Sequence, residues 1–207
     1  TLTRGEKVTS GMNPKLNQKG CTLIVLAEWK PPVYSNTGIT VITSSIRRNS
    51  PQHLDSKIHH NNLLNNILAV IEANTANVDS AVMLDMNGFI SETNDTNIFL
   101  VRDNVILTPT TDSCLPGLTR QMILEIAAEE GIPTQEKNLS LTDLYSADEV
   151  FTSGTMGEIT PILKADGRDI GEGKAGAMTK RIQKLHSAIA YKTGEPVPFK
   201  EPAKEDN

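Results

Sequence analysis

Apolar runs separated by turn-forming pairs dominate the pattern of this 207-residue chain. Residues 21–29 (CTLIVLAEW) form a β-rich apolar run that predicts a strand, and residues 39–45 (ITVITSS) return to strand composition. The pairs at 87–88 (Asn-Gly) and 103–104 (Asp-Asn) each separate two apolar runs, which is typical of tight hairpins. Several strands are therefore expected, paired largely as hairpins in a mixed or antiparallel sheet.

Three stretches carry apolar residues at helical spacing. The first, 57–74, is expected to open at Lys57, because its apolar residues recur at helical spacing while its asparagines fall mostly on other faces. The second begins near residue 118 after a Pro-Gly turn and is terminated by Gly131, and the third follows residue 176. With a short helix candidate at 141–147, the pattern predicts an α+β fold of helices packed on a mixed sheet.

The best internal boundary is a short linker at 30–38 (KPPVYSNTG). Two consecutive prolines remove two backbone donors there, and the Ser, Asn and Gly residues that follow favour turns. Residues 39–194 would then form the main domain. The proline-rich, charged tail at 195–207 is expected to be disordered.

Composition narrows the functional classes. The chain has 20 Lys+Arg and 25 Asp+Glu, a net charge of −5, which argues against nucleic acid as a partner. No apolar run is long enough to span a membrane. The two cysteines, Cys21 and Cys114, can form neither a disulfide framework nor a zinc cluster, so a reducing intracellular compartment is expected. A metal site is not expected, because His59 and His60 would point about 100° apart on a helix.

One literal nucleotide motif is present at 171–176 (GEGKAG), just before the last helix. A dinucleotide site would need a following second strand with an acidic residue, and here only the proline-rich tail follows. Turn glycines at a helix start are the simpler interpretation.

Four further features could carry chemistry, and each also has an ordinary structural explanation. Lys57 could be an imine-forming amine or a surface lysine beside an apolar face. Glu92 ends a strand, and if buried it would need a cationic partner. The turns at 115–120 (LPGLTR) and 153–155 (SGT) offer backbone N–H groups and hydroxyls of the kind that bind phosphate.

Taken in order, these elements resemble the class IV (fold-type IV) pyridoxal-phosphate-dependent aminotransferases, nearest to the branched-chain type. The resemblance implies that family's large domain, preceded at 1–29 by the last part of its small domain, with the rest of that domain missing. It rests on five ordered segments: 55–64 (DSKIHHNNLL), 84–101 (LDMNGFISETNDTNIFLV), 107–120 (LTPTTDSCLPGLTR), 147–161 (ADEVFTSGTMGEITP) and 166–183 (DGRDIGEGKAGAMTKRIQ).

The resemblance implies a site for pyridoxal 5'-phosphate. Lys57 matches the lysine that holds the cofactor as an aldimine, and Glu92 matches the acid that faces the pyridine nitrogen. Leu118, Thr119 and Thr155 match contacts to the phosphate. The amides of Thr155 and Met156 resemble the place where branched-chain enzymes receive the substrate carboxylate.

The chain also departs from the family pattern. Asn62 stands where branched-chain enzymes commonly have a tyrosine that touches the phenolic oxygen of the cofactor, and the loop after Glu92 carries a second carboxylate, Asp95. An Arg-x-His pair typical of D-amino-acid enzymes is absent from the loop that starts at residue 6.

The implied reaction is amino transfer between a branched-chain amino acid and a 2-oxo acid such as 2-oxoglutarate, in a homodimer. D-amino-acid transamination and an aminodeoxychorismate-lyase-like reaction remain as alternatives. So do a catalytically incomplete scaffold or interaction module, and a nucleotide-binding module at 171–176.

Overall fold

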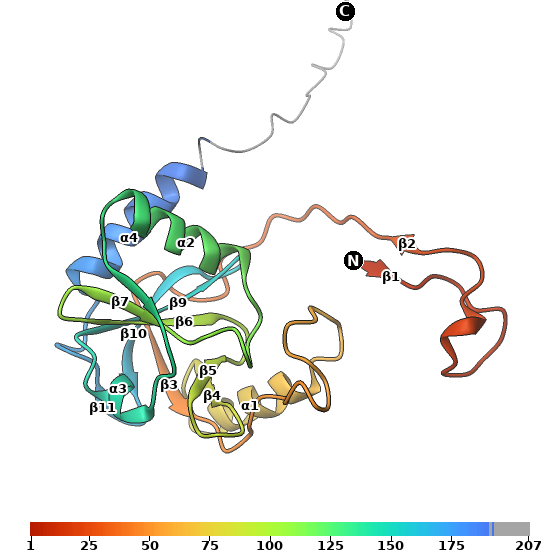
Figure 1. Ribbon diagram of the computed structural model, residues 1–207, viewed down its shortest axis with the longest axis horizontal. Helices are drawn as coiled ribbons and strands as arrows, with labels where there is room; N and C mark the ends of the chain where they lie inside the picture. The colour runs from red at the N-terminus through yellow and green to blue at the C-terminus, as the bar shows by residue number, and fades with distance from the viewer. Residues whose placement is uncertain (191, 193–207) are drawn as a thin grey trace, which may run out of the picture. The chain divides into compact units, whose positions relative to one another are not determined.

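A computed structural model describes residues 1–190 and 192 of the chain (Figure 1). The chain divides into two compact units, Thr1–Pro31 and Pro32–Asn207. The predicted tail at 195–207 lies outside the described residues.

The first unit has little regular structure. Its strands β1 (Leu2–Thr3) and β2 (Thr22–Leu23) form one short antiparallel pair, and a 3₁₀ helix, η1 (Pro14–Leu16), lies between them in the chain. The strand predicted over 21–29 is therefore wrong beyond Leu23. A strand needs a partner for its backbone groups, and β1 offers only two residues. Residues 24–29 are exposed, and no residue of 1–31 is buried.

The second unit is built on a nine-stranded sheet. The sheet is mixed, within the predicted class of a mixed or antiparallel sheet. The strand order is β5-β4-β3-β10-β9-β6-β7-β8, with β11 paired to β10. The pairs β3–β4, β3–β10 and β7–β8 are parallel, and the others are antiparallel. The strands are β3 (Ile39–Thr43), β4 (Ser80–Leu84), β5 (Ile90–Thr93), β6 (Asn97–Arg102), β7 (Val105–Thr108), β8 (Thr134–Glu136), β9 (Glu149–Gly154), β10 (Glu158–Ala165) and β11 (Arg168–Asp169).

The sheet curls back on itself, and this positions the site. Strands β5 and β6 are joined by residues 94–96 alone, yet β4, β3, β10 and β9 stand between them in the strand order. The two ends of this path therefore approach each other. The Thr93 N–H donates to the Thr96 carbonyl at 2.8 Å across the short connection. The end of β5 and the start of β6 thus lie close together.

Both faces of the sheet are covered, which explains the continuous apolar runs in the sequence. Along β6, Ile98 and Leu100 join one core cluster, while Phe99 and Val101 join another. The second cluster lies under α2 (Leu118–Glu129) and α4 (Ala177–Ala190), which run side by side in Figure 1. The first cluster includes residues of α3 (Leu141–Tyr145).

The predicted turns are confirmed. The hairpin between β6 and β7 turns at Asp103 and Asn104, with φ of 51° and 63°, as a tight two-residue turn requires. The hairpin between β4 and β5 contains the 87–88 pair. Helix α2 ends just before Gly131, whose φ of 64° is the usual left-handed helix stop.

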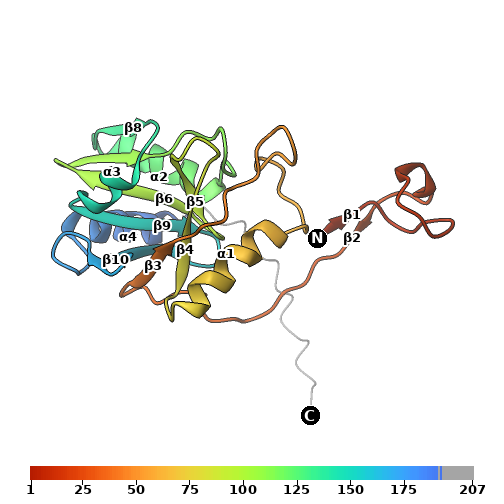
Figure 2. The same cartoon turned by 90° about the horizontal axis from the view of Figure 1, so that it is seen from below.

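The first predicted helix starts later than expected. Helix α1 spans Leu64–Thr75 (Figure 2). Lys57 therefore lies in a turn before it. Side chains compete for the backbone there, because Asp55 accepts from the Lys57 N–H at 3.0 Å and His60 accepts from the Asn62 N–H at 3.0 Å.

The packing face of α1 is made of alanines. Ala69 and Ala73 are fully buried in a small cluster with β4. The large residues of the predicted apolar stripe, Leu64, Ile67, Leu68 and Ile71, are instead 42–60% exposed. This part of the helix surface is left exposed by the described residues.

Candidate active site

A cavity of about 410 Å³ opens where the curled sheet brings four segments together. Residues 33–34, the β5–β6 connection, the start of α2 and the β9–β10 turn all line it. Its polar lining includes Glu92, Asp95, Thr119, Ser153 and Thr155. We call it the central cavity. An adjoining recess of about 150 Å³ shares Glu92 and Asp95 with it and adds Arg48.

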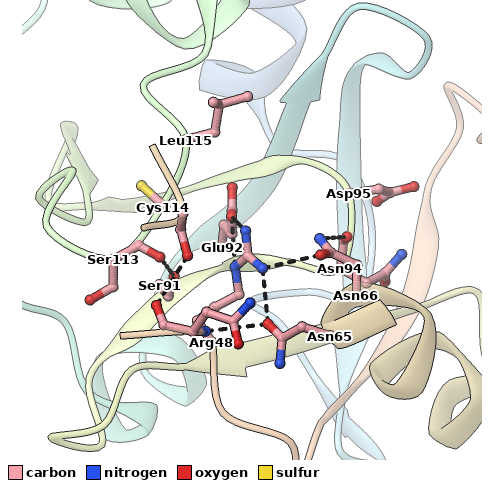
Figure 3. A network of polar contacts seen from close by, with 12 residues as sticks. Arg48, Asn65, Asn66, Ser91, Glu92, Asn94, Asp95, Ser113, Cys114 and Leu115 are labelled. Atoms are coloured by element: carbon pink, nitrogen blue, oxygen red, sulfur yellow. Dashed lines mark hydrogen bonds and ion pairs between the residues drawn. The ribbon is translucent and has the colours of Figure 1, made fainter. Parts of the chain in front are cut away.

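Glu92 sits at the junction of the two hollows and is only 5% exposed. Its Oε1 accepts from Arg48 Nε at 2.8 Å and from Arg48 Nη2 at 2.5 Å, while Nη1 of the same arginine donates to Asn65 and Asn66 at 3.0 and 3.2 Å (Figure 3). The Asn97 amide donates to Oε2 at 3.3 Å. The buried carboxylate therefore has the cationic partner that its burial requires.

Burial and the arginine act in opposite directions on this acid. Desolvation raises the pKa of Glu92, because the charged form loses water, and the Arg48 charge and its hydrogen bonds lower it. Desolvation is the larger effect, and the pKa is raised to about 7. The proton affinity of Glu92 is thus sensitive to any further cation that enters the cavity.

The start of α2 presents its backbone donors without a side-chain cap. Gly117 is the N-cap residue, and no side chain hydrogen-bonds to the first turn. A Cβ added at Gly117 would lie 2.3 Å from Asn97 Oδ1, so glycine is needed for this close approach. Leu118 is 88% exposed and Thr119 is half-buried, and both line the central cavity. The arrangement suits an anion, since N–H groups and the helix dipole point the same way.

The turn from β9 to β10 forms the opposite polar wall. The Ser153 hydroxyl is buried and has no hydrogen-bond partner among the residues that the structure describes. Thr155 and Met156 are exposed in the turn and line the cavity. A Cβ on Gly154 would lie 2.9 Å from Thr96 Cγ2, so this turn packs closely on the β5–β6 connection. An unsatisfied buried hydroxyl at a cavity wall fits a ligand oxygen.

Two of the expected residues do not line the central cavity. Lys57 is exposed, with 43% of its side chain accessible, and its Nζ lies 3.9 Å from the Asp55 carboxylate. Asn62 is also exposed. The residues on either side of Lys57, Ser56 and Ile58, line the adjoining recess. The structure therefore brings Glu92, Leu118, Thr119, Thr155 and Met156 together, with Lys57 one residue away from the recess wall.

The glycine motif at 171–176 has a structural explanation. The Glu149 carboxylate occupies the start of α4, where it accepts from the N–H groups of Met178 and Thr179 at 2.9 and 2.7 Å. A Cβ on Gly176 would lie 2.0 Å from Glu149 Cδ. The place at the start of α4 where an anion would bind is thus occupied by the Glu149 carboxylate.

Comparisons with known proteins identify the family of this chain. Residues 1–165 match the model of the family described as Amino-transferase class IV. The chain belongs to the class IV aminotransferase family. It is 58% identical over 199 residues to branched-chain-amino-acid aminotransferase-like protein 2 of Arabidopsis thaliana, covering 96% of this chain and 36% of that protein.

Solved structures extend the likeness to the fold. The branched-chain amino acid aminotransferase of Escherichia coli superposes with a TM-score of 0.73 at 40% identity, over 75% of this chain and 53% of that one. The branched-chain amino acid aminotransferase of Thermobaculum terrenum, in its PLP-containing holo form, gives a TM-score of 0.74 at 28% identity, over 78% of this chain and 54% of that one. The fold is therefore that of a fold-type IV aminotransferase, as expected. The chain spans about a third to a half of the length of these three relatives.

Two residues of the candidate site, Arg48 and Tyr34, were not singled out from the sequence. Arg48 was signalled only indirectly, by the argument that a buried Glu92 would need a cation. Tyr34, in the predicted linker, lines the central cavity and was not signalled at all.

Two absences apply to the part of the chain that the structure describes. No group of three or more His, Cys, Asp or Glu side chains there is placed to hold a metal ion. None of the helices there has both the length and the apolar character to cross a bilayer.

Proposed function

We propose that this chain forms the cofactor-binding part of a pyridoxal-phosphate-dependent branched-chain aminotransferase. The observation that carries the proposal is the central cavity, which joins Glu92 to the uncapped start of α2 and to the turn at Thr155. The reaction is amino transfer between a branched-chain amino acid and a 2-oxo acid such as 2-oxoglutarate. The names of the Escherichia coli and Thermobaculum terrenum proteins support the substrate class, and the holo form of the latter supports the cofactor.

The residues that line the cavity fit a phosphorylated pyridine aldehyde. The N–H groups of Leu118 and Thr119 and the hydroxyls of Thr119 and Thr155 would receive the phosphate. The Ser153 hydroxyl, which has no hydrogen-bond partner among the described residues, adds a donor on the wall that carries Thr155. Glu92 would accept a hydrogen bond from the protonated pyridine nitrogen.

Pyridoxal 5'-phosphate, when bound, supplies an aldehyde that condenses with amines and a ring that withdraws electrons. Glu92 would hold a proton on the ring nitrogen, because its negative charge favours the protonated form there. The amides of Thr155 and Met156 would orient the substrate carboxylate.

Lys57 has the most demanding role. Its amine would bind the cofactor's aldehyde and would move a proton to or from the substrate α-carbon. For this, its Nζ must leave Asp55, which it approaches only to 3.9 Å, and reach the recess that Ser56 and Ile58 line. Asn62 would donate to the phenolic oxygen of the cofactor.

The exposed large residues of α1 support a homodimer. Leu64, Ile67, Leu68 and Ile71 leave an apolar helix surface open to water, and burial against a second copy would remove that cost. The assembly state can be checked by light scattering on the wild type and on Ile67→Glu.

The decisive experiment tests Lys57. The protein made from its full-length coding sequence is mixed with pyridoxal 5'-phosphate, and its visible absorbance is recorded before and after borohydride reduction. We expect a yellow complex, a mass increase on the peptide that contains Lys57, and amino transfer from leucine. Lys57→Ala should lose all three.

Lys164→Ala is a matched control, because Lys164 is 46% exposed and pairs with Asp169 at 3.2 Å, much as Lys57 pairs with Asp55. It should keep the colour and the activity. The exposure of Lys57 favours one other candidate, a catalytically incomplete scaffold. A colourless wild type with an unlabelled Lys57 would support that scaffold and refute the enzyme.

A further inference from the structure

Arg120 is a buried cation in the first turn of α2. The residue is only 3% exposed and lies three positions after the N-cap residue, Gly117. A cation in this place opposes the helix dipole, because the positive end of the dipole is at the start of the helix. The first turn, which the structure describes in full, contains no acidic residue. The position is therefore electrostatically unfavourable unless an anion binds close to it.

The guanidinium of Arg120 reaches the ends of two strands. Its Nη2 donates to the Pro109 carbonyl at 2.9 Å and to Glu136 Oε2 at 2.5 Å. Pro109 directly follows β7, and Glu136 is the last residue of β8, where it pairs with Thr108 of β7. The side chain therefore fastens the first turn of α2 to the ends of β7 and β8.

A second contact holds the chain just before α2. The Asn97 amide donates to the Leu115 carbonyl at 2.8 Å. A Cβ added at Gly117 would lie 2.3 Å from Asn97 Oδ1 and 3.7 Å from Arg120 Cβ, so this glycine packs between the two side chains. Asn97 and Arg120 together fix the direction in which the N–H groups of the first turn point.

The charge of Arg120 is only partly compensated. Its side chain is 4% exposed, whereas that of its partner Glu136 is 48% exposed, so water screens the acid. The Nε of Arg120 is buried and has no hydrogen-bond partner among the described residues. Burial raises the pKa of the neighbouring Cys114 thiol to about 12, so this group stays neutral and supplies no negative charge. The field of Arg120 thus adds to that of the helix dipole at the start of α2.

An independent observation indicates that the cavity beside this helix start receives a polar ligand. Ser153 is 2% exposed and lines the central cavity, and its hydroxyl has no partner in the part of the chain that the structure describes. Leu118 and Thr119 line the same cavity, but Arg120 is not among the described residues that do so. Arg120 can therefore act on a ligand through the helix start that it holds and through its charge, without touching the ligand.

We propose that Arg120 is a positioning residue for the phosphate group of the cofactor. Its hydrogen bonds hold the N–H groups of Leu118 and Thr119 toward the cavity, and its buried charge makes that place favourable for an anion. The effect is specific to the phosphate, because the pyridine ring is assigned to Glu92. The inference rests on the proposed aminotransferase function and refines its cofactor site.

The test compares pyridoxal 5'-phosphate with pyridoxal, which lacks the phosphate, in absorbance titrations of the full-length protein. The measured quantity is the ratio of the Kd for pyridoxal to the Kd for pyridoxal 5'-phosphate, which isolates the contribution of the phosphate. Arg120→Met should lower this ratio about tenfold, with the Kd for pyridoxal near the wild-type value. Arg120→Lys should lower it about threefold, because an ammonium keeps the charge but does not reproduce the planar guanidinium contacts.

Arg181→Met is the matched control. Arg181 pairs with Glu130, the C-cap residue at the other end of α2, at 2.8 Å. Its ratio should stay near the wild-type value. Glu136→Gln keeps an oxygen that accepts from Arg120 and removes the negative charge, so its ratio should equal or exceed that of the wild type. This variant and Arg120→Lys carry the test if Arg120→Met does not fold.

Arg120 variants that weaken the binding of both ligands by the same factor would overturn the proposal, because a purely structural role affects both ligands alike. A Glu136→Gln ratio that falls as far as that of Arg120→Met would also overturn it, since the loss would then follow the ion pair and not the arginine. A wild type whose absorbance changes with neither ligand would instead refute the cofactor-binding function on which the inference rests.

Discussion

Replacing Arg48 by methionine removes the cation that pairs with the buried Glu92. The arginine side chain is 8% exposed and the glutamate side chain 7%. The substitution takes away two hydrogen bonds to Glu92 and one each to Asn65 and Asn66. Methionine keeps much of the volume, so the main change is a carboxylate left buried without a cation.

Removing one partner of a buried ion pair costs about 3–5 kcal/mol, because the remaining charge keeps its desolvation penalty. We therefore expect Arg48→Met to lower the free energy of unfolding at pH 8 by an amount in that range. The measurement is a urea titration followed by fluorescence or circular dichroism, with the midpoint and slope compared between variants.

Arg181→Met is the matched control. Arg181 also pairs with a glutamate, Glu130, at 2.8 Å, but the two side chains are 48% and 40% exposed. An exposed pair contributes about 0–1 kcal/mol, since water screens both charges. If Arg48→Met costs no more than Arg181→Met, the reasoning about the buried pair is wrong.

The pH dependence gives an independent check. The pKa of Glu92 is raised by burial from 4.5 to about 7, so its contribution to stability is fully present below pH 4.5 and is lost as the pH rises through 7. Arg48 lowers this pKa, so Arg48→Met should raise it further. The stability difference between wild type and variant should accordingly widen from pH 4.5 to pH 8, and a constant difference would contradict the assignment.

Two more substitutions probe the two helix starts. Glu149→Ala should lower the free energy of unfolding by about 1–2 kcal/mol, because three hydrogen bonds to Met178 and Thr179 at the start of α4 disappear. Glu129→Ala, an exposed control at the end of α2, should change it by less than about 0.5 kcal/mol in the same urea titration. Gly117→Ala should raise the dissociation constant for pyridoxal 5'-phosphate at least about tenfold by absorbance titration, since a Cβ there meets Asn97 Oδ1 at 2.3 Å. Unchanged affinity would show that this approach of backbone to side chain is not needed for binding.

Local signals in the sequence predicted the local features well. The hairpin turns at 87–88 and 103–104 depend on residues within the turn, and both formed as expected. The strand predicted over 21–29 failed because strand formation depends on a distant partner, which a sequence window does not contain. The helix expected at Lys57 began at Leu64, because Asp55 and His60 bond to the backbone in ways that periodicity does not register.

The residues of the candidate site could be predicted where they lie in segments that resemble the family. Glu92, Thr119 and Thr155 line one cavity, and their roles toward a cofactor stay predictions. Arg48 was not predicted, because its partner is 44 residues away and the two meet only through the parallel pairing of β3 with β4 and the turn into β5. Tyr34 was missed for a similar reason, since it meets Asp95 across a separation of 61 residues.

The interior position of β3 has a consequence for how the polypeptide acquires its shape during synthesis. This strand is the first of its sheet to leave the ribosome, yet one of its two neighbours, β10, begins only at residue 158. Until then, one edge of a β-branched strand lies open, which slows maturation and favours unwanted association. Chaperone dependence should therefore be greatest for ribosome-bound intermediates whose exposed portion stops short of residue 165.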